Sequence, residues 1–139
     1  MCDNYFKNKK VVIIGASGSL GQAYTQAFFQ AGAHLFLLGR NMDKIAAFSE
    51  DIAFNIPICS VDITSENSLK VAVSEVQKWS DSLDIVINAT GFDVRKSITS
   101  HSEGEINQTM AINLIGAILV SKYFLPLLKN QKGATIVHS

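Results

Sequence analysis

Five short apolar runs, separated by segments with the periodicity of amphipathic helices, are the feature that most constrains the fold of this 139-residue chain. The runs lie at 10–14, 34–38, 56–61, 83–88 and 134–138. They are continuous rather than alternating in hydrophobicity, as is typical of parallel strands that helices cover on both faces. The order predicts an α/β fold with a doubly wound parallel sheet, in which ligands bind at the carboxyl ends of the strands. The length fits a single domain over residues 1–139.

The segments between the runs show helical faces and helix ends. One predicted face carries Leu20, Tyr24, Ala27 and Ala31 and ends at Gly32, and another carries Leu69, Val73, Val76 and Trp79. Asn41 and Ser65 stand where a helix N-cap is expected. In the last helical segment a stripe predicted to be buried consists of Ile106, Met110, Asn113, Ala117, Val120 and Phe124.

A glycine-rich loop follows the first run in the stretch VVIIGASGSLG. Gly15, Gly18 and Gly21 lie between a predicted strand and a predicted helix, where a tight turn can present free N–H groups to a phosphate. This position indicates a site for a dinucleotide pyrophosphate, and the alternative is an ordinary strand-to-helix turn. A Walker phosphate loop is excluded because no Gly-Lys-Ser or Gly-Lys-Thr follows the glycines.

The end of the second run favours one dinucleotide over the other. An Asp or Glu about twenty residues beyond the glycines usually binds the ribose hydroxyl of NAD. No acidic residue occurs between Gly15 and Asp43, and Arg40 stands at the expected place. A guanidinium pairs well with a 2′-phosphate, so the sequence favours NADP over NAD. The alternative is a solvated surface arginine.

These motifs together resemble the short-chain dehydrogenases/reductases over essentially the whole chain. GASGSLG is similar to that family's cofactor loop, GRN to the NADP-type end of strand two, and VDIT to the end of strand three. NATG at 88–91, Asn113 and the GATIVHS tail continue the series in the same order. The resemblance implies a Rossmann-type fold and these cofactor-binding residues: Gly15, Ser17, Gly18, Ser19, Leu20, Gly21, Arg40, Asp62, Ile63, Asn88, Ala89, Thr90 and Gly91.

The resemblance also implies individual roles. Asp62 would hydrogen-bond the adenine amino group, and the alternative is that it is only a turn residue. Asn113 would hold a water in the proton relay to the catalytic lysine, and the alternative is a structural asparagine bonded to neighbouring backbone. Family members often dimerise through the long helix, here about 103–130, so a homo-oligomer is one expectation.

The sequence departs from the family pattern at several positions. Ile14 stands where the family has Thr, Ser19 replaces the middle glycine, and Ala89 replaces the second Asn of Asn-Asn-Ala-Gly. The GxxGxxG spacing is closer to the extended, epimerase-like branch, whereas the tail resembles the commoner branch. The Tyr-x-x-x-Lys pair that does the family's acid–base work does not follow the fifth run. The chain therefore resembles the amino-terminal, cofactor-binding half of a reductase and is expected to be inactive alone, with Ser139 at the catalytic serine or just short of it.

The function expected from these features is NADP-dependent hydride transfer between nicotinamide and a carbonyl or alcohol substrate. The alternatives are a non-catalytic dinucleotide-binding module and an extended-branch epimerase or dehydratase. Twelve basic and twelve acidic residues give no net charge that would attract nucleic acid or an anionic membrane. No signal-type segment or long uninterrupted apolar stretch is evident, so a cytoplasmic protein is expected. Cys2 and Cys59 lack metal-ligand spacing and are expected to be reduced thiols rather than disulfide or zinc ligands.

Overall fold

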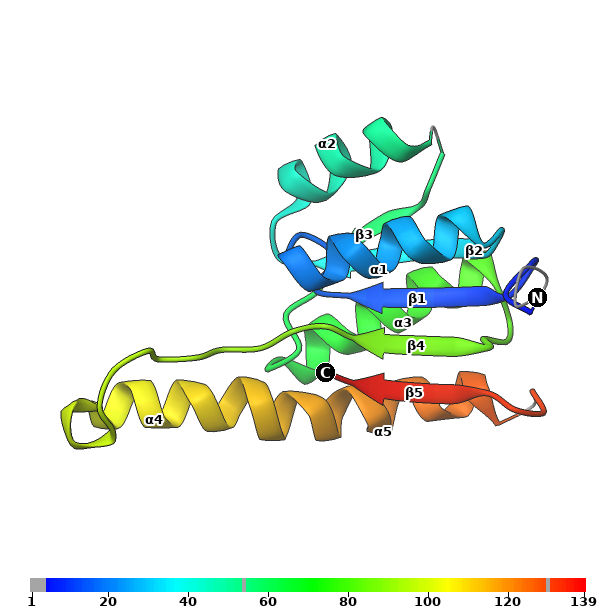
Figure 1. The fold of residues 1–139 in the computed structure, drawn as a ribbon. Helices are drawn as coiled ribbons and strands as arrows, with labels where there is room; N and C mark the ends of the chain where they lie inside the picture. Colours follow the sequence, from blue (N-terminus) through cyan, green and yellow to red (C-terminus); the bar gives the residue numbers. More distant parts are fainter. Residues whose placement is uncertain (1–4, 54, 130) are drawn as a thin grey trace.

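The computed structural model describes residues 5–53, 55–129 and 131–139. Its centre is a parallel five-stranded sheet in the order β3-β2-β1-β4-β5 (Figure 1). The strands are β1 (Lys10–Ile14), β2 (His34–Gly39), β3 (Ile58–Ser60), β4 (Ile85–Asn88) and β5 (Thr135–His138). The expected open parallel sheet is confirmed, and every strand lies close to its predicted range. The reversal of strand order between β1 and β4 is the topological switch point at which such folds bind ligands.

Helices connect the strands and cover the sheet on both faces (Figure 1). They are α1 (Ser19–Gln30), α2 (Met42–Ile52), α3 (Glu66–Trp79), α4 (Glu103–Met110), the π-helical turn η2 (Ala111–Gly116), α5 (Ala117–Leu128) and the short 3-10 turn η1 (Ile98–Ser100). α4, η2 and α5 follow one another without interruption and form one long helix from Glu103 to Leu128.

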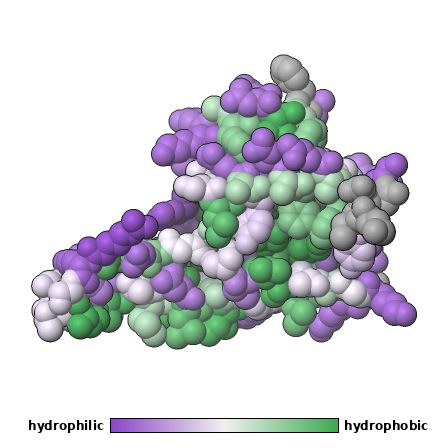
Figure 2. Space-filling model, in the orientation of Figure 1, coloured by the Kyte–Doolittle hydropathy of each residue, from purple (hydrophilic) through white to green (hydrophobic). Residues whose placement is uncertain are grey.

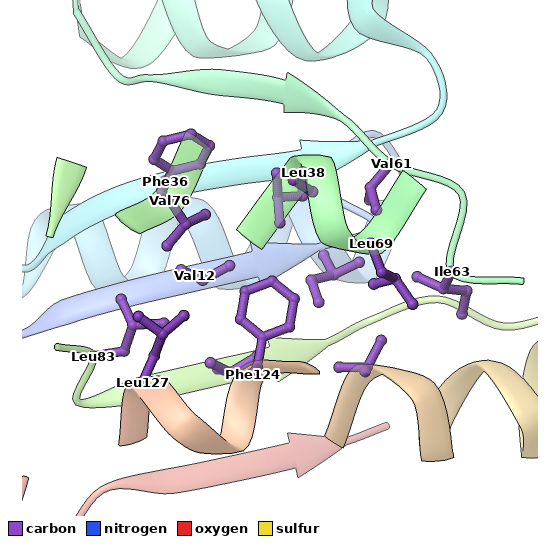
Figure 3. Packing of buried hydrophobic residues seen from close by; sticks show 14 of the residues in the cluster. Val12, Phe36, Leu38, Val61, Ile63, Leu69, Val76, Leu83, Phe124 and Leu127 are labelled. Carbon is purple, nitrogen blue, oxygen red and sulfur yellow. The ribbon is translucent and has the colours of Figure 1, made fainter. Parts of the chain in front are cut away.

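Two hydrophobic cores flank the sheet, one on each face. Val12, Phe36 and Leu38 point toward α3 and α5, where Leu69 and Phe124 meet them (Figure 3). Val11, Ile13 and Leu37 point to the other face, which α1 and α2 cover. Because both faces of β1 are buried, all four residues from Val11 to Ile14 are fully inaccessible to solvent. This double burial explains why the strands read as continuous apolar runs.

The predicted helix ends are confirmed. The Asn41 side chain accepts a hydrogen bond from the Lys44 N–H at 3.0 Å and caps α2. Ser65 caps α3 by accepting from the Ser68 N–H at 3.3 Å. Gly32 follows α1 in the left-handed conformation, with φ of +79°. The predicted α3 face is also confirmed, since Leu69 and Val76 are buried and Val73 and Trp79 pack against the same core.

The predicted face of α1 is correct only in part: Tyr24 packs against the core and Ala31 is half-buried. Leu20 and Ala27 are exposed, and the buried residues are Gly21 and Thr25. The reason is a close approach that apolar periodicity does not reveal. A Cβ on Gly21 would lie 2.2 Å from the Gly15 carbonyl oxygen, so the glycine side of α1 packs against the loop. The Thr25 hydroxyl donates to the Gly21 carbonyl at 2.7 Å, so this buried polar group has a hydrogen-bond partner.

The predicted buried stripe of the long helix is correct only in its second half. Val120 and Phe124 are fully buried and Ala117 partly so, but Ile106, Met110 and Asn113 are exposed. The reason is geometric: α4 and the turn that follows it extend past the carboxyl edge of the sheet, so the sheet does not cover these three side chains (Figure 1). The helix from Glu103 to Leu128 is long and apolar enough to cross a membrane by length and composition alone. Its second half packs on the sheet as a core helix.

Candidate cofactor-binding cleft

A cleft of about 810 Å³ lies at the carboxyl ends of the strands, where the loops after β1, β2, β3 and β4 meet. Its lining includes these residues from the sequence-based set: Gly15, Ser17, Gly18, Arg40, Asp62, Ile63, Ala89, Thr90 and Gly91. It also includes Gly39, Asn41, Met42, Asp43, Val61, Thr64 and Ile112. Residues from four separate loops are thus brought together in one hollow.

Gly15 and Gly21 are required by the packing of the chain itself. Gly15 has a φ of +82°, and a Cβ there would lie 2.9 Å from the Ala89 carbonyl group. Its N–H donates to the Leu38 carbonyl at 2.8 Å, which holds the loop against β2. Gly21 lies against the same loop, as described above. A Cβ would clash at both positions, so glycine is required there by the packing of the chain and not by a ligand.

Gly18 differs from these two glycines. It is exposed, has an ordinary φ of −79° and has no chain atom closer than 3.5 Å to the place of a Cβ. A Cβ at Gly18 would fit the protein without a clash, and Gly18 itself lines the cleft. The space in front of Gly18 is therefore open to a ligand that approaches the backbone.

The amino end of α1 opens beside this space. Gly18 is its N-cap and supplies no capping side chain, and the first turn, Ser19 to Gly21, contains no acidic residue. By contrast, α2, α3 and α4 each begin with a side-chain cap and an acidic residue in the first turn. Uncapped N–H groups and the helix dipole favour an anion at such an end. Ser19 and Leu20 lie in this first turn and are exposed, without lining the cleft themselves.

Arg40 follows directly after β2 and is exposed at the rim of the cleft. Its neighbour Asn41 is occupied in capping α2, which turns the chain at this point. Across the cleft, Asp62 Oδ1 accepts from the Thr64 N–H at 2.9 Å and from the Thr64 hydroxyl at 2.7 Å. These bonds hold the pKa of Asp62 below its usual value, and the charge of Arg40 lowers the pKa further. Asp62 therefore stabilises the turn after β3 through its bonds to Thr64.

The segment after β4 forms the opposite wall. Asn88 is buried at the end of β4, and its Oδ1 accepts from the Thr90 hydroxyl at 2.5 Å and the Thr90 N–H at 3.2 Å. Asn88 thus lies behind the wall, whereas Ala89, Thr90 and Gly91 line the cleft. The Ala89 N–H donates to the Ile14 carbonyl at 2.8 Å, which ties this wall to the glycine loop.

Asn113 lies outside the cleft lining, next to Ile112, which belongs to it. Its Nδ2 donates to the Phe92 carbonyl at 2.8 Å and its Oδ1 accepts from the Phe92 N–H at 2.9 Å. The side chain therefore connects η2 to the segment after β4. These partners match the structural alternative, and the π-helical turn around Asn113 is a feature often found at functional sites.

Sequence reasoning missed several lining residues. Asn41, Met42, Asp43 and Thr64 lie two to four residues beyond the ends of β2 and β3, so their place in the loops at this edge of the sheet was a usable signal. Ile112 comes from a distant helix and carries no sequence signal. No cluster of three or more metal-binding side chains occurs among the described residues. Cys59 is a free, half-buried thiol whose pKa is raised by burial, while Cys2 lies outside the described residues.

Comparisons with known proteins agree with this geometry. The family model described as short chain dehydrogenase matches residues 9–138. Glucose 1-dehydrogenase of Gluconobacter oxydans is 31% identical over 142 residues, which cover 96% of this chain and 53% of that protein. Dehydrogenase/reductase SDR family member 7B of Mus musculus is 27% identical, with 96% and 43% covered.

Solved structures give the same result. A short-chain dehydrogenase/reductase, glucose/ribitol dehydrogenase, from Brucella melitensis has a TM-score of 0.89 at 25% identity, covering 97% of this chain and 57% of that chain. A putative short chain dehydrogenase from Escherichia coli CFT073, complexed with NADPH, shares the fold with a TM-score of 0.90 at 18% identity, covering 98% and 60%. The chain spans about half the length of the curated relatives it matches. It belongs to the short-chain dehydrogenase family, whose members are NAD(P)-binding oxidoreductases, and it matches the amino-terminal half of the family fold.

Proposed function

We propose that this chain binds a nicotinamide dinucleotide, preferentially NADP(H), and forms the cofactor-binding half of an oxidoreductase acting on a carbonyl or alcohol. The observation that carries the proposal is the open space before Gly18, next to the uncapped amino end of α1. A pyrophosphate there would accept hydrogen bonds from the first-turn N–H groups, including those of Ser19, Leu20 and Gly21.

The preference for NADP rests on Arg40. Its guanidinium lies at the end of β2, at the rim of the cleft, where the family places the adenosine ribose. A cation at this point attracts a 2′-phosphate, and its planar fork can donate two hydrogen bonds to it. Asp62 and Ile63 would face the adenine, and Ala89, Thr90 and Gly91 the rest of the cofactor along β4.

The bound cofactor supplies hydride-transfer chemistry, and the chain's own residues position it. Asn113 is proposed to act next to the reaction as well as to hold Phe92, because it lies beside the segment that follows β4. The substrate would be a small carbonyl or alcohol compound. A cytoplasmic location and pairing of two copies through the long helix complete the proposal, supported by the balanced charge and the apolar outer face of that helix.

Arg40→Asp tests the cofactor assignment. For the unmodified chain we expect tighter binding of NADPH than of NADH, measured by calorimetry at fixed ionic strength. The substitution removes a charge-assisted bond and adds a repelling carboxylate, so NADPH affinity should fall about tenfold or more, with NADH little affected. Arg95→Asp is the matched control, because Arg95 pairs with Asp93 on an exposed segment outside the cleft lining. Equal affinities for both nucleotides in the unmodified chain would contradict the NADP preference.

A second candidate is a dinucleotide-binding module without catalysis. Within these 139 residues, neither Tyr24 nor Tyr123 precedes a lysine by four residues, and Tyr5 with Lys9 lies before β1. NADPH oxidation assayed against a panel of carbonyl compounds separates the two. Binding without turnover, in a protein extended by any downstream coding sequence, would favour the module. Product formed without net NADPH oxidation, detected by NMR of the reaction mixture, would favour the extended branch suggested by the glycine spacing, because epimerases and dehydratases return the hydride to the substrate.

A further inference from the structure

A chain of hydrogen bonds runs from the wall of the cleft to the long helix through His138. Ile14, Asn88 and His138 lie opposite one another on β1, β4 and β5, so they form one row at the carboxyl edge of the sheet. Asn88 Nδ2 lies 3.2 Å from His138 Nδ1, and His138 Nε2 lies 2.8 Å from the Ser121 hydroxyl on α5. At the other end, Asn88 Oδ1 holds both Thr90 donors.

The donors and acceptors in this network agree on one proton arrangement. The Ser121 hydroxyl has a single proton, which it donates to the Ala117 carbonyl at 3.1 Å. With its proton used in this way, the same oxygen accepts from His138 Nε2, which agrees with an Nε2-protonated ring. The Nδ1 atom of the neutral ring is then an acceptor, and it receives an N–H of the Asn88 amide.

This arrangement also fixes which way the Asn88 amide points. With its nitrogen directed at His138, its oxygen faces Thr90, whose N–H and hydroxyl are both donors. The reversed amide would place an NH₂ group against the Thr90 N–H and lose that bond. Because Asn88 is buried, solvent does not readily replace a lost partner.

We propose that His138 is a positioning residue of the cofactor cleft: its neutral, Nε2-protonated ring orients the Asn88 amide and thereby holds Thr90 and Gly91 in place. A proton on Nδ1 would remove the acceptor that Asn88 uses. The wall formed by Thr90 and Gly91 would then lose its support as the ring becomes charged. The consequence for the cofactor rests on the proposed function, whereas the support of Thr90 does not.

The surroundings of His138 are consistent with a neutral ring. Partial burial lowers the pKa of His138 below its ordinary value. On β4 the facing residues from Ile85 to Asn88 are not titratable. On α5 the titratable neighbours of Ser121 are Lys122 and Tyr123, and both bind Glu66 of α3. The outer side of His138 is exposed at the edge of the sheet, so protons reach it from solvent.

The first test follows Thr90 directly by NMR in the full chain. We expect the Thr90 backbone amide signal to shift with pH at the same midpoint as the His138 ring, and the ring nitrogens to report the Nε2-protonated form above that midpoint. In His138→Gln, which keeps one acceptor and one donor on an uncharged side chain, the Thr90 signal should no longer titrate. His34→Gln is the control, because His34 is exposed at the opposite, amino-terminal end of β2. A Thr90 signal that ignores the His138 titration, or a ring protonated on Nδ1, would overturn the proposal.

The second test measures NADP⁺ affinity by calorimetry at about pH 7.5 and about pH 5.5. The ligand's 2′-phosphate also titrates in this range. Its effect on affinity is the same in His138→Gln, so the comparison of the two proteins removes it. We expect the affinity of the unmodified chain to fall about fivefold more than that of the variant, as loss of one supporting hydrogen bond implies. Equal pH dependence in both proteins would overturn the link to the cofactor. Absence of NADP⁺ binding at either pH would instead overturn the proposed function, while the NMR titration still decides the role of His138.

Discussion

The three glycines of the loop after β1 are expected to respond differently to the same substitution. Gly15→Ala and Gly21→Ala should each lower the free energy of unfolding by about 2 kcal/mol or more, because each added Cβ meets backbone and Gly15 also has a positive φ. Gly18→Ala should leave stability nearly unchanged, because its Cβ meets no atom closer than 3.5 Å. It should instead weaken NADPH binding by filling the space before α1.

Urea unfolding and NADPH titration of the three variants measure these effects. Gly104→Ala on α4 is the control, since its Cβ would also lie in open space, 3.9 Å from the Ser102 hydroxyl oxygen, but far from the lining of the cleft. A Gly18→Ala chain that binds NADPH as tightly as the unmodified chain would show that the ligand does not approach this backbone.

At the scale of one element, the start of α4 depends on an ionised carboxylate. Ser102 and Glu105 form a capping box, and Lys96 Nζ lies 2.8 Å from Glu105 Oε2. The hydrogen bond from Lys96, followed by that from the Ser102 backbone, lowers the pKa of Glu105 to about 2. This carboxylate therefore stabilises the folded start of α4 above its ordinary pKa of 4.5, and the effect is lost as the pH falls from about 4.5 to about 2.

We accordingly expect amide exchange in the first turn of α4 to accelerate as the pH is lowered through this window, after correction for intrinsic rates. Glu105→Gln should remove this pH dependence, because its neutral side chain does not titrate and no longer pairs with Lys96, whereas it can still accept a hydrogen bond from the Ser102 N–H. Glu103→Gln is the control, since Glu103 lies in the same turn outside the capping box. An unmodified chain with constant protection down to about pH 2 would contradict the role of Glu105.

At the scale of the whole molecule, the long helix leaves an apolar stripe uncovered. Ile106, Met110, Leu114, Ile118 and Leu125 follow one another at steps of four or seven residues and are each at least 46% exposed. Figure 2 shows apolar side chains gathered along this edge of the molecule, over α4 and α5. Within the described residues β5 pairs only with β4, so its outer edge is also open. Surfaces of both kinds promote association between chains.

We expect the 139-residue chain to self-associate in a concentration-dependent manner. The double substitution Leu114→Lys with Ile118→Lys should shift it toward monomer in sedimentation velocity, because charges interrupt the stripe. Val71→Lys on α3 is the matched control, being an exposed apolar residue away from the stripe. A monodisperse monomer at all concentrations would show that the stripe and the strand edge do not associate.

Much of the candidate site could be predicted from sequence because its residues follow strand ends. The carboxyl ends of parallel strands lie at one edge of the sheet, so the sequence alone places Gly15, Arg40, Asp62 and Thr90 together. Ile112 could not, because only the packing of the long helix brings it there. Ser19, Leu20, Gly21 and Asn88 are near the cleft without lining it, which depends on side-chain direction rather than chain position.

The sequence by itself determined the strands, the helix caps and the chemistry of the glycine loop, since these depend on local backbone preferences and on burial from both faces. Only the tertiary structure decided which side of α1 is buried, because the contact between Gly21 and Gly15 is a matter of distance rather than hydrophobicity. It also decided the place of Asn113, which the periodicity assigned to a buried stripe. Periodicity shows that one face of a helix is apolar, but the extent of the neighbouring sheet determines where that face is covered. Because α4 and the start of η2 pass beyond the sheet, Asn113 remains exposed, and its side chain bonds the backbone of Phe92.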